Sequence, residues 1–173
     1  SYNCLDRHLE GENAWRKNKA AIIWEGEPGD SRVLTYGELH AQVCRFANGL
    51  RALGVRSGDC VIIYMPLVPE AVFAMLACAR IGAVHSVVFG GFAAKELATR
   101  IEDAKPKLIL SASCGIEPGR IVQYKPLLDE AIRLSSVKPQ GCVILQRPQQ
   151  ACDLVAGRDH DWASLRRAAL DAG

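Results

Sequence analysis

Apolar residues along the chain follow two patterns, short continuous runs and stripes with helical spacing. Continuous runs such as residues 60–65 are typical of strands that are buried on both faces of a parallel sheet. The predicted strands cover residues 20–24, 32–34, 60–65, 83–89, 107–113 and 142–146. The predicted helices cover residues 2–11, 35–54, 69–82, 94–104, 126–135 and 162–170. Strands that alternate with helices in this way predict an α/β fold, a Rossmann-like parallel sheet with helices on both faces.

The first thirty-five residues differ from this alternation. A turn over residues 26–30 joins the first two strands into a hairpin, and Thr35 with Glu38 forms a capping box that opens the next helix. We therefore divide the chain into an N-terminal helix and hairpin segment, residues 1–35, and a first α/β subdomain, residues 36–173.

Composition and charge exclude two classes of partner. Hydrophobic residues make up 49% of the 173 residues and charged residues 23%, with a net charge of +2. This charge is too small to favour binding to nucleic acid or to an anionic membrane surface. Residues 60–77 carry one charge, but Pro66 and Pro69 interrupt them, so we expect a strand followed by a buried helix and no membrane span.

The seven cysteines include no Cys-x-x-Cys pair, which disfavours a zinc site or a thioredoxin-type motif. An odd number of thiols in mostly apolar segments predicts a reducing compartment, the cytoplasm or alternatively the mitochondrial matrix. No signal peptide is recognisable, and Ser1 suggests that the start is processed or truncated.

No complete catalytic motif is present in the sequence. It has no Gly-x-x-x-x-Gly-Lys-Ser/Thr, Gly-x-Gly-x-x-Gly, His-Glu-x-x-His or Gly-x-Ser-x-Gly pattern. The four histidines are scattered, and we expect His85, inside an apolar strand, to be a hydrogen-bonded core residue. We predict no catalytic residue and no metal ligand in this chain.

Two loops that follow predicted strands are candidate binding segments. In Phe89-Gly90-Gly91-Phe92, two glycines allow close backbone approach to a phosphate or adenine, or they only form a tight turn with positive φ. In Gly115-Ile116-Glu117-Pro118-Gly119-Arg120, Pro118 and Gly119 fit a type II turn. Arg120 then either binds a phosphate or lies solvated on a surface turn. The two loops end strands that we expect to be neighbours, which favours binding for both.

Five segments of the sequence carry a family resemblance. They read SYNCLDRHL, AIIWEGEPGD, LTYGELH, VIIYMPLVPEAVFAMLACARIGAVHSVVFGGF and GIEPGR. Their order and spacing resemble the N-terminal part of short-chain acyl-CoA synthetases, the AMP-forming acetate–CoA and propionate–CoA ligases. The resemblance extends from Ser1 to about Trp162. It implies that the sheet is an incomplete part of the large N-terminal domain, whose remainder is the expected partner.

The resemblance implies a two-step ligase reaction. A short carboxylate attacks ATP to give an acyl-adenylate and pyrophosphate, with Mg²⁺ balancing charge, and the CoA thiol then displaces AMP. In the family, the phosphate-binding loop, the carboxylate pocket and the catalytic lysine lie further along than Gly173. The cofactors CoA, ATP and Mg²⁺ thus belong to the parent enzyme, and we expect no adenylation by this chain alone.

One family site falls within the chain, the site that holds the nucleotide end of CoA. The residues that the resemblance assigns to it are Glu117, Pro118, Gly119, Arg120, Phe89, Gly90 and Gly91. Arg120 is the expected partner of the 3′-phosphate, and Phe89 with its two glycines, joined by Val122, is expected to pack against the adenine.

The loop departs from acetate-type members, which carry an arginine where this chain has Glu117. This carboxylate either pairs with Arg120 or accepts a hydrogen bond from the adenine amino group. Because Glu-Pro-Gly-Arg resembles the propionate-type branch, we expect a propionate–CoA ligase, with an acetate–CoA ligase as the alternative. A second alternative is a truncated, non-catalytic module that binds CoA or an adenine nucleotide. A dinucleotide-binding oxidoreductase domain is disfavoured, because residues 65–69 have prolines where a glycine fingerprint belongs.

Overall fold

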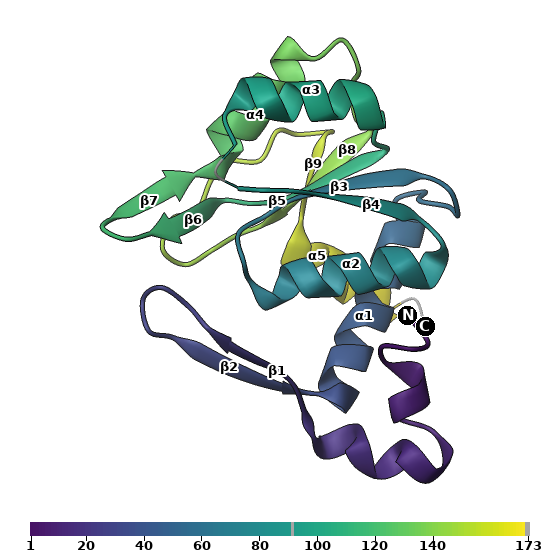
Figure 1. The fold of residues 1–173 in the computed structure, drawn as a ribbon. Coiled ribbons are helices and arrows are strands. Elements are labelled where there is room, and N and C mark those ends of the chain that lie inside the picture. The colour runs from purple at the N-terminus through teal and green to yellow at the C-terminus, as the bar shows by residue number, and fades with distance from the viewer. Residues whose placement is uncertain (91, 172–173) are drawn as a thin grey trace.

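A five-stranded sheet lies between two layers of helices in the computed structural model, which describes residues 1–90 and 92–171 (Figure 1). The strands are β1 Ala20–Glu25, β2 Ser31–Thr35, β3 Cys60–Tyr64, β4 Val84–Val88, β5 Leu108–Ala112, β6 Cys114–Glu117, β7 Arg120–Gln123, β8 Gly141–Leu145 and β9 Asp159–Asp161. The helices are α1 Tyr36–Ala52, α2 Pro69–Ile81, α3 Ala94–Ala104, α4 Tyr124–Leu134 and α5 Trp162–Asp171, and the 3-10 helices are η1 Asp6–His8 and η2 Gly11–Asn18. The sheet order is β4-β3-β5-β8-β9, and its strands are all parallel.

Alternate residues of the central strands enter two separate hydrophobic cores. On β3, Val61 and Ile63 pack into the core beneath α1, α2 and α5, whereas Ile62 and Tyr64 pack into the core beneath α3 and α4. Figure 1 shows these two groups of helices on opposite faces of the sheet. The predicted α/β fold, a parallel sheet covered on both faces, is confirmed.

Capping residues in the sequence correctly predicted where α1 begins and where α2 ends. The Glu38 backbone N–H donates to Thr35 Oγ1 at 3.2 Å, and the Thr35 N–H donates to Glu38 Oε2 at 2.8 Å, which is the predicted capping box. Gly82 follows α2 with a φ of 74°, the left-handed conformation that ends many helices.

Short or polar elements account for the predictions that were wrong. The predicted helix over residues 2–11 is replaced by two 3-10 helices. The predicted strands and helices leave residues 147–161 unassigned, yet this segment contains β9, whose sequence Asp-His-Asp has no apolar signal. The glycine-rich turn at residues 115–120 lies within a hairpin of β6 and β7.

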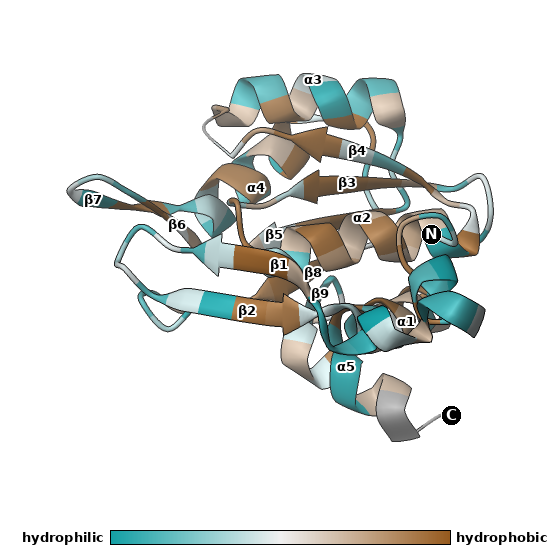
Figure 2. Cartoon of the chain, turned by 60° about the horizontal axis from the view of Figure 1, so that its bottom comes forward, coloured by the Kyte–Doolittle hydropathy of each residue, from teal (hydrophilic) through white to brown (hydrophobic). Residues whose placement is uncertain are grey.

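Strand β4 is an edge strand, because among the described residues it pairs with β3 alone. Val84 and Val87 are 57% and 54% exposed there, and Figure 2 shows apolar colour on this strand. The prediction that His85 is a core residue is wrong, because its side chain is exposed on this edge. No described helix has the length and apolarity needed to cross a bilayer, and residues 60–77 form β3 and most of α2.

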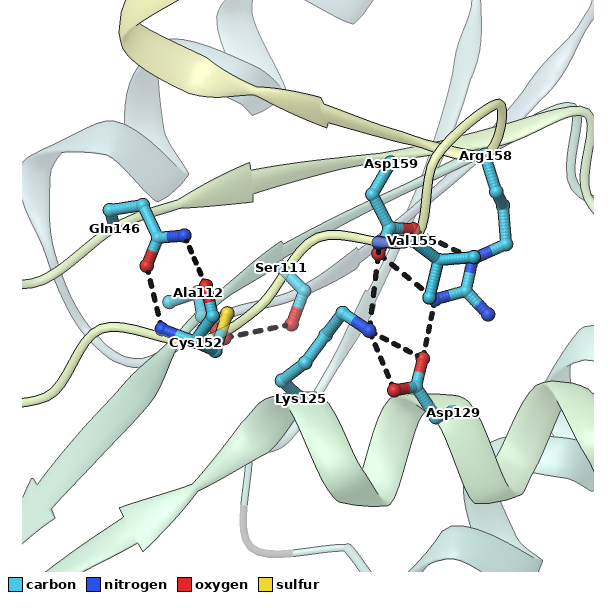
Figure 3. Close-up of polar contacts among 9 residues, drawn as sticks. All are labelled: Ser111, Ala112, Lys125, Asp129, Gln146, Cys152, Val155, Arg158 and Asp159. Atoms are coloured by element: carbon cyan, nitrogen blue, oxygen red, sulfur yellow. Dashed lines mark hydrogen bonds and ion pairs between the residues drawn. The ribbon is translucent and has the colours of Figure 1, made fainter.

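A buried ion-pair network fixes the segment that leads into β9 (Figure 3). The Asp159 carboxylate is fully buried and accepts hydrogen bonds from Arg158 Nε at 2.7 Å and from the Val155 N–H at 2.9 Å. Lys125 Nζ, on α4, lies 3.1 Å from Asp159 and 2.6 Å from Asp129. Because both positive charges are matched, the network joins the last strand to α4 without leaving a buried charge unpaired.

Replacing Asp159 with asparagine is expected to destabilise the chain by about 3–5 kcal/mol, because Lys125 and Arg158 would lose a buried counter-charge. Urea denaturation measures this change. The matched control is Glu130→Gln, which breaks an exposed pair with Arg133 and is expected to cost less than about 1 kcal/mol. Equal effects of the two substitutions would contradict the role given to the network.

The same network predicts a pH dependence. Burial alone would raise the pKa of Asp159, but hydrogen bonds from Arg158, the Val155 N–H and Lys125 hold that pKa below its usual value of 3.8. The resulting stabilisation is complete above the unfolded-state pKa and is lost as the pH falls through the lower folded-state pKa. The stability difference between the unaltered chain and Asp159→Asn should therefore shrink below about pH 4.

Candidate functional site

A hollow of about 520 Å³ opens at the carboxyl ends of the central strands, where parallel sheets usually place ligands. We call it the inner hollow. Its walls come from the segment that follows β3, the end of β4 with Phe89 and Gly90, and the two hairpins. The hairpin residues that line it are Trp24, Glu25, Gly26, Glu27, Ile116 and Glu117.

The two candidate loops meet in this hollow, although they do not end neighbouring strands as predicted. Strand β3 lies between β4 and β5 in the sheet. The loops come together because the β6–β7 hairpin projects beyond the sheet on the same side as the β1–β2 hairpin (Figure 1).

Gly90 is required by close packing and not by backbone conformation. Its φ is not positive, so a positive-φ turn, the alternative that the sequence left open, does not explain this glycine. A Cβ at this position would lie 1.9 Å from the hydroxyl of Tyr124, and one at Gly115 would lie 2.8 Å from the same ring. The Tyr124 ring therefore occupies the space that both glycines leave open, and it stacks on Tyr64 with ring centroids 5.0 Å apart.

The side chains of Tyr64 and Tyr124 are neutral phenols. Tyr64 donates a hydrogen bond to the Phe92 carbonyl at 3.0 Å. Burial raises the pKa of Tyr64 to about 12, with a further rise from Tyr124. Burial, and then the nearby Glu117 carboxylate, also raises the pKa of Tyr124. Both phenols consequently stay protonated at neutral pH and do not act as bases.

Glu117 and Arg120 face one another across the tip of the β6–β7 hairpin. Arg120 donates from Nε and Nη2 to Glu117 Oε2 at 2.8 and 2.6 Å. Gly119, between them, has a φ of 75°, as the predicted turn requires. The side chains are 70% and 39% exposed for Arg120 and Glu117, so the pair contributes little stability and can open for a ligand.

A second hollow of about 420 Å³ adjoins the first, and we call it the outer hollow. It is lined by Gly119 and Arg120, and it shares Glu27, Ile116 and Glu117 with the inner hollow. The structure thus brings Phe89, Gly90, Glu117, Gly119 and Arg120 to one two-part groove between the hairpins. Pro118 shapes the turn without lining either hollow, Val122 packs in the core beneath α4, and Gly91 lies outside the described residues.

Arg147 is a lining residue that the sequence reasoning missed. It lies just after β8, is 9% exposed, and lines the inner hollow. Its backbone N–H donates to Ser113 Oγ at 2.9 Å, which ties the carboxyl end of β8 to that of β5. The sequence does contain a signal for this role, because Arg147 is the first charged residue after a continuous apolar strand. Such a residue lies at the carboxyl-end edge of the sheet, where ligands bind.

Another hollow, of about 640 Å³, lies at the opposite end of the sheet. It is lined by residues that end α1 and α2, including Arg51, Arg56 and Arg80. Two of these arginines have structural partners, since Arg56 donates to carbonyls at the end of α1 and Arg80 pairs with Asp6. Within the part of the chain that is described, three or more His, Cys, Asp or Glu side chains nowhere cluster as a metal site would require.

Comparison with known proteins decides the family. The sequence model of the family described as AMP-binding enzyme matches residues 9–165. The chain belongs to the AMP-binding enzyme family. The matched range includes both hairpins, the central strands and Arg147, so the groove lies within the family domain.

Individual relatives are short-chain synthetases. The chain is 52% identical to the acetyl-coenzyme A synthetase of Shewanella sediminis over 99% of its own length and 26% of that protein. It is 50% identical to the mitochondrial acyl-CoA synthetase short-chain family member 3 of Rattus norvegicus, over 93% of its own length and 23% of that protein. The chain thus spans about a quarter of the length of these curated relatives.

Gly90→Ala is expected to destabilise the chain by about 1–3 kcal/mol, because the new methyl group would collide with Tyr124. A double-mutant cycle tests this cause by thermal or urea unfolding. In a Tyr124→Leu background, Gly90→Ala should cost much less. An undiminished cost in that background would mean that the glycine is needed for another reason.

Proposed function

We propose that this chain forms the part of an AMP-forming short-chain acyl-CoA synthetase that holds the nucleotide end of CoA. The observation that carries the proposal is the groove between the two hairpins, which combines an exposed arginine with an exposed aromatic ring. Arg120 offers a guanidinium that can form two parallel hydrogen bonds to a phosphate. Phe89 is 69% exposed and offers a ring on which an adenine can stack.

In the parent reaction, a short carboxylate and ATP form an acyl-adenylate with Mg²⁺, and the CoA thiol then displaces AMP. We assign no adenylation step to the residues of this chain. Their proposed task is to bind and orient CoA. We infer that the substrates are a short-chain carboxylate and CoA, and that the partner is the remainder of the catalytic domain.

Propionate is the proposed carboxylate, and the reason is Glu117. The pair that Glu117 forms with Arg120 supports the first of the two roles considered for it, and the Glu-Pro-Gly-Arg loop resembles the propionate-type branch. Acetate is the second candidate, because several relatives of about 50% identity are acetyl-coenzyme A synthetases. We propose a reducing compartment, the cytoplasm or alternatively the mitochondrial matrix, since all seven thiols are unpaired and the relative from Rattus norvegicus is mitochondrial.

The CoA site is tested by titrating the chain with CoA and with dephospho-CoA, which lacks the 3′-phosphate. We expect the chain to bind CoA about tenfold more tightly, because one charge-assisted contact is lost with dephospho-CoA. Arg120→Gln should abolish this preference, whereas Arg133→Gln, an exposed arginine on α4, should preserve it. Equal affinity of the unaltered chain for both ligands would refute the role of Arg120.

Glu117→Gln should strengthen CoA binding, which is the opposite of the effect expected for Arg120→Gln. It removes the carboxylate that competes with a phosphate for Arg120, so CoA affinity should rise by a few fold while dephospho-CoA affinity changes less. A loss of CoA affinity instead would indicate that Glu117 binds the nucleotide directly, for example through the adenine amino group.

The absence of adenylation chemistry in this chain is a separate prediction. With ATP, Mg²⁺ and propionate or acetate, the chain alone should release no pyrophosphate above background in a coupled assay. Carboxylate-dependent release would contradict the assignment of adenylation to the remainder of the enzyme. If CoA also fails to bind, a non-catalytic adenine-nucleotide module becomes the better reading, and AMP titration tests it.

A further inference from the structure

Arg147 carries a buried positive charge whose purpose the fold does not explain. Arg147 is 9% exposed and lines the inner hollow together with Tyr124 and Glu117. We call the part of the inner hollow next to Arg147 its floor. Its guanidinium donates one long hydrogen bond, 3.4 Å from Nη1 to the Cys114 carbonyl. Within residues 1–90 and 92–171, no carboxylate lies within the 4.0 Å that defines an ion pair with it.

An unpaired guanidinium is costly in such a place. Removing a charge from water costs several kcal/mol unless a counter-charge or several hydrogen bonds replace the lost hydration. Lys125, the other buried cation in the described part of the chain, follows this rule, because two carboxylates hold it. No described carboxylate holds Arg147 in this way, so its charge remains available to an anion that enters the hollow.

The carboxylates that line the inner hollow do not neutralise Arg147. Glu25 and Glu27 lie on the exposed tip of the β1–β2 hairpin, where water screens them. Glu117 is already engaged by Arg120 at the boundary with the outer hollow. An anion at the floor of the hollow therefore lies closest to Arg147. Glu25, Glu27 and Glu117 at the rim repel anions that do not reach Arg147.

The two hollows contain one lining cation each, Arg147 in the inner and Arg120 in the outer. CoA likewise has two anionic groups, the 3′-phosphate and the pyrophosphate attached at the 5′ position of the same ribose. If Arg120 binds the 3′-phosphate, Arg147 is the cation that is left to bind the pyrophosphate.

We infer that Arg147 binds the pyrophosphate of CoA at the floor of the inner hollow, while Arg120 holds the 3′-phosphate at the rim. This inference rests on the proposed CoA site. It assigns Arg147 a direct contact with the ligand and gives the nucleotide a direction, with the 3′-phosphate outward and the pyrophosphate toward the carboxyl ends of β5 and β8.

The experiment combines two arginine variants with two ligands in calorimetric titrations. Arg147→Met should weaken CoA and dephospho-CoA alike, by about tenfold or more, because both ligands keep the pyrophosphate. Arg120→Gln should weaken CoA alone. The affinity for pantetheine, which has no phosphate, should not change with either substitution. Arg147→Lys should retain part of the affinity, since it keeps the charge and loses the planar fork.

A stability measurement separates binding from a structural role. Without ligand, Arg147→Met should leave the melting temperature unchanged or raise it, because it removes an unpaired buried charge. The matched control is Arg133→Met, which should change neither affinity. A clear fall in the melting temperature with Arg147→Met would show a structural arginine and overturn the inference.

The possible failures are distinguishable. If the unaltered chain does not bind CoA, the proposed function fails and this inference fails with it. If CoA binds and Arg147→Met changes neither affinity, the CoA site stands and Arg147 is not part of it. If Arg147→Met weakens CoA but not dephospho-CoA, the arginine contacts the 3′-phosphate, and the assigned direction of the nucleotide is wrong.

Discussion

Strand β3 is the element on which the rest of the structure depends, because both of its edges are paired and both of its faces are buried. Its residues Val61 to Tyr64 are at most 1% exposed, and they alternate between the two hydrophobic cores. A strand in this position requires a helical layer on each face, since neither face can be left in water. The connections through α2 and α3 supply these layers and keep the neighbouring strands parallel.

Parallel strands bring their carboxyl ends to one edge of the sheet, and this edge is where the groove forms. Two hairpins extend over it, and Tyr124 fills the space beside Gly90 and Gly115. The position of Gly90 is thus set by a packed aromatic pair, Tyr64 and Tyr124. Side chains that are already packed in this way would need little reordering to bind the proposed ligand, which lowers the entropic cost of association.

Buried charges are treated in two different ways in this molecule. Lys125, Arg158 and Asp159 neutralise one another and attach β9 to α4. Arg147, which is 9% exposed, lacks a carboxylate partner among the described residues and lines the hollow instead. The paired network stabilises the fold, whereas Arg147 leaves a positive charge that a bound anion can neutralise.

The sequence by itself determined those features that neighbouring residues decide: the alternation of strands and helices, the capping box at Thr35, and the turn at Gly119. It also located the two loops that line the groove. Only the tertiary structure decided the strand order β4-β3-β5, the exposure of His85 on an edge strand, and the location of Arg147 at the floor of the hollow. These features depend on which distant segments pair and cover one another, and hydrophobic periodicity carries no information about that choice of partners.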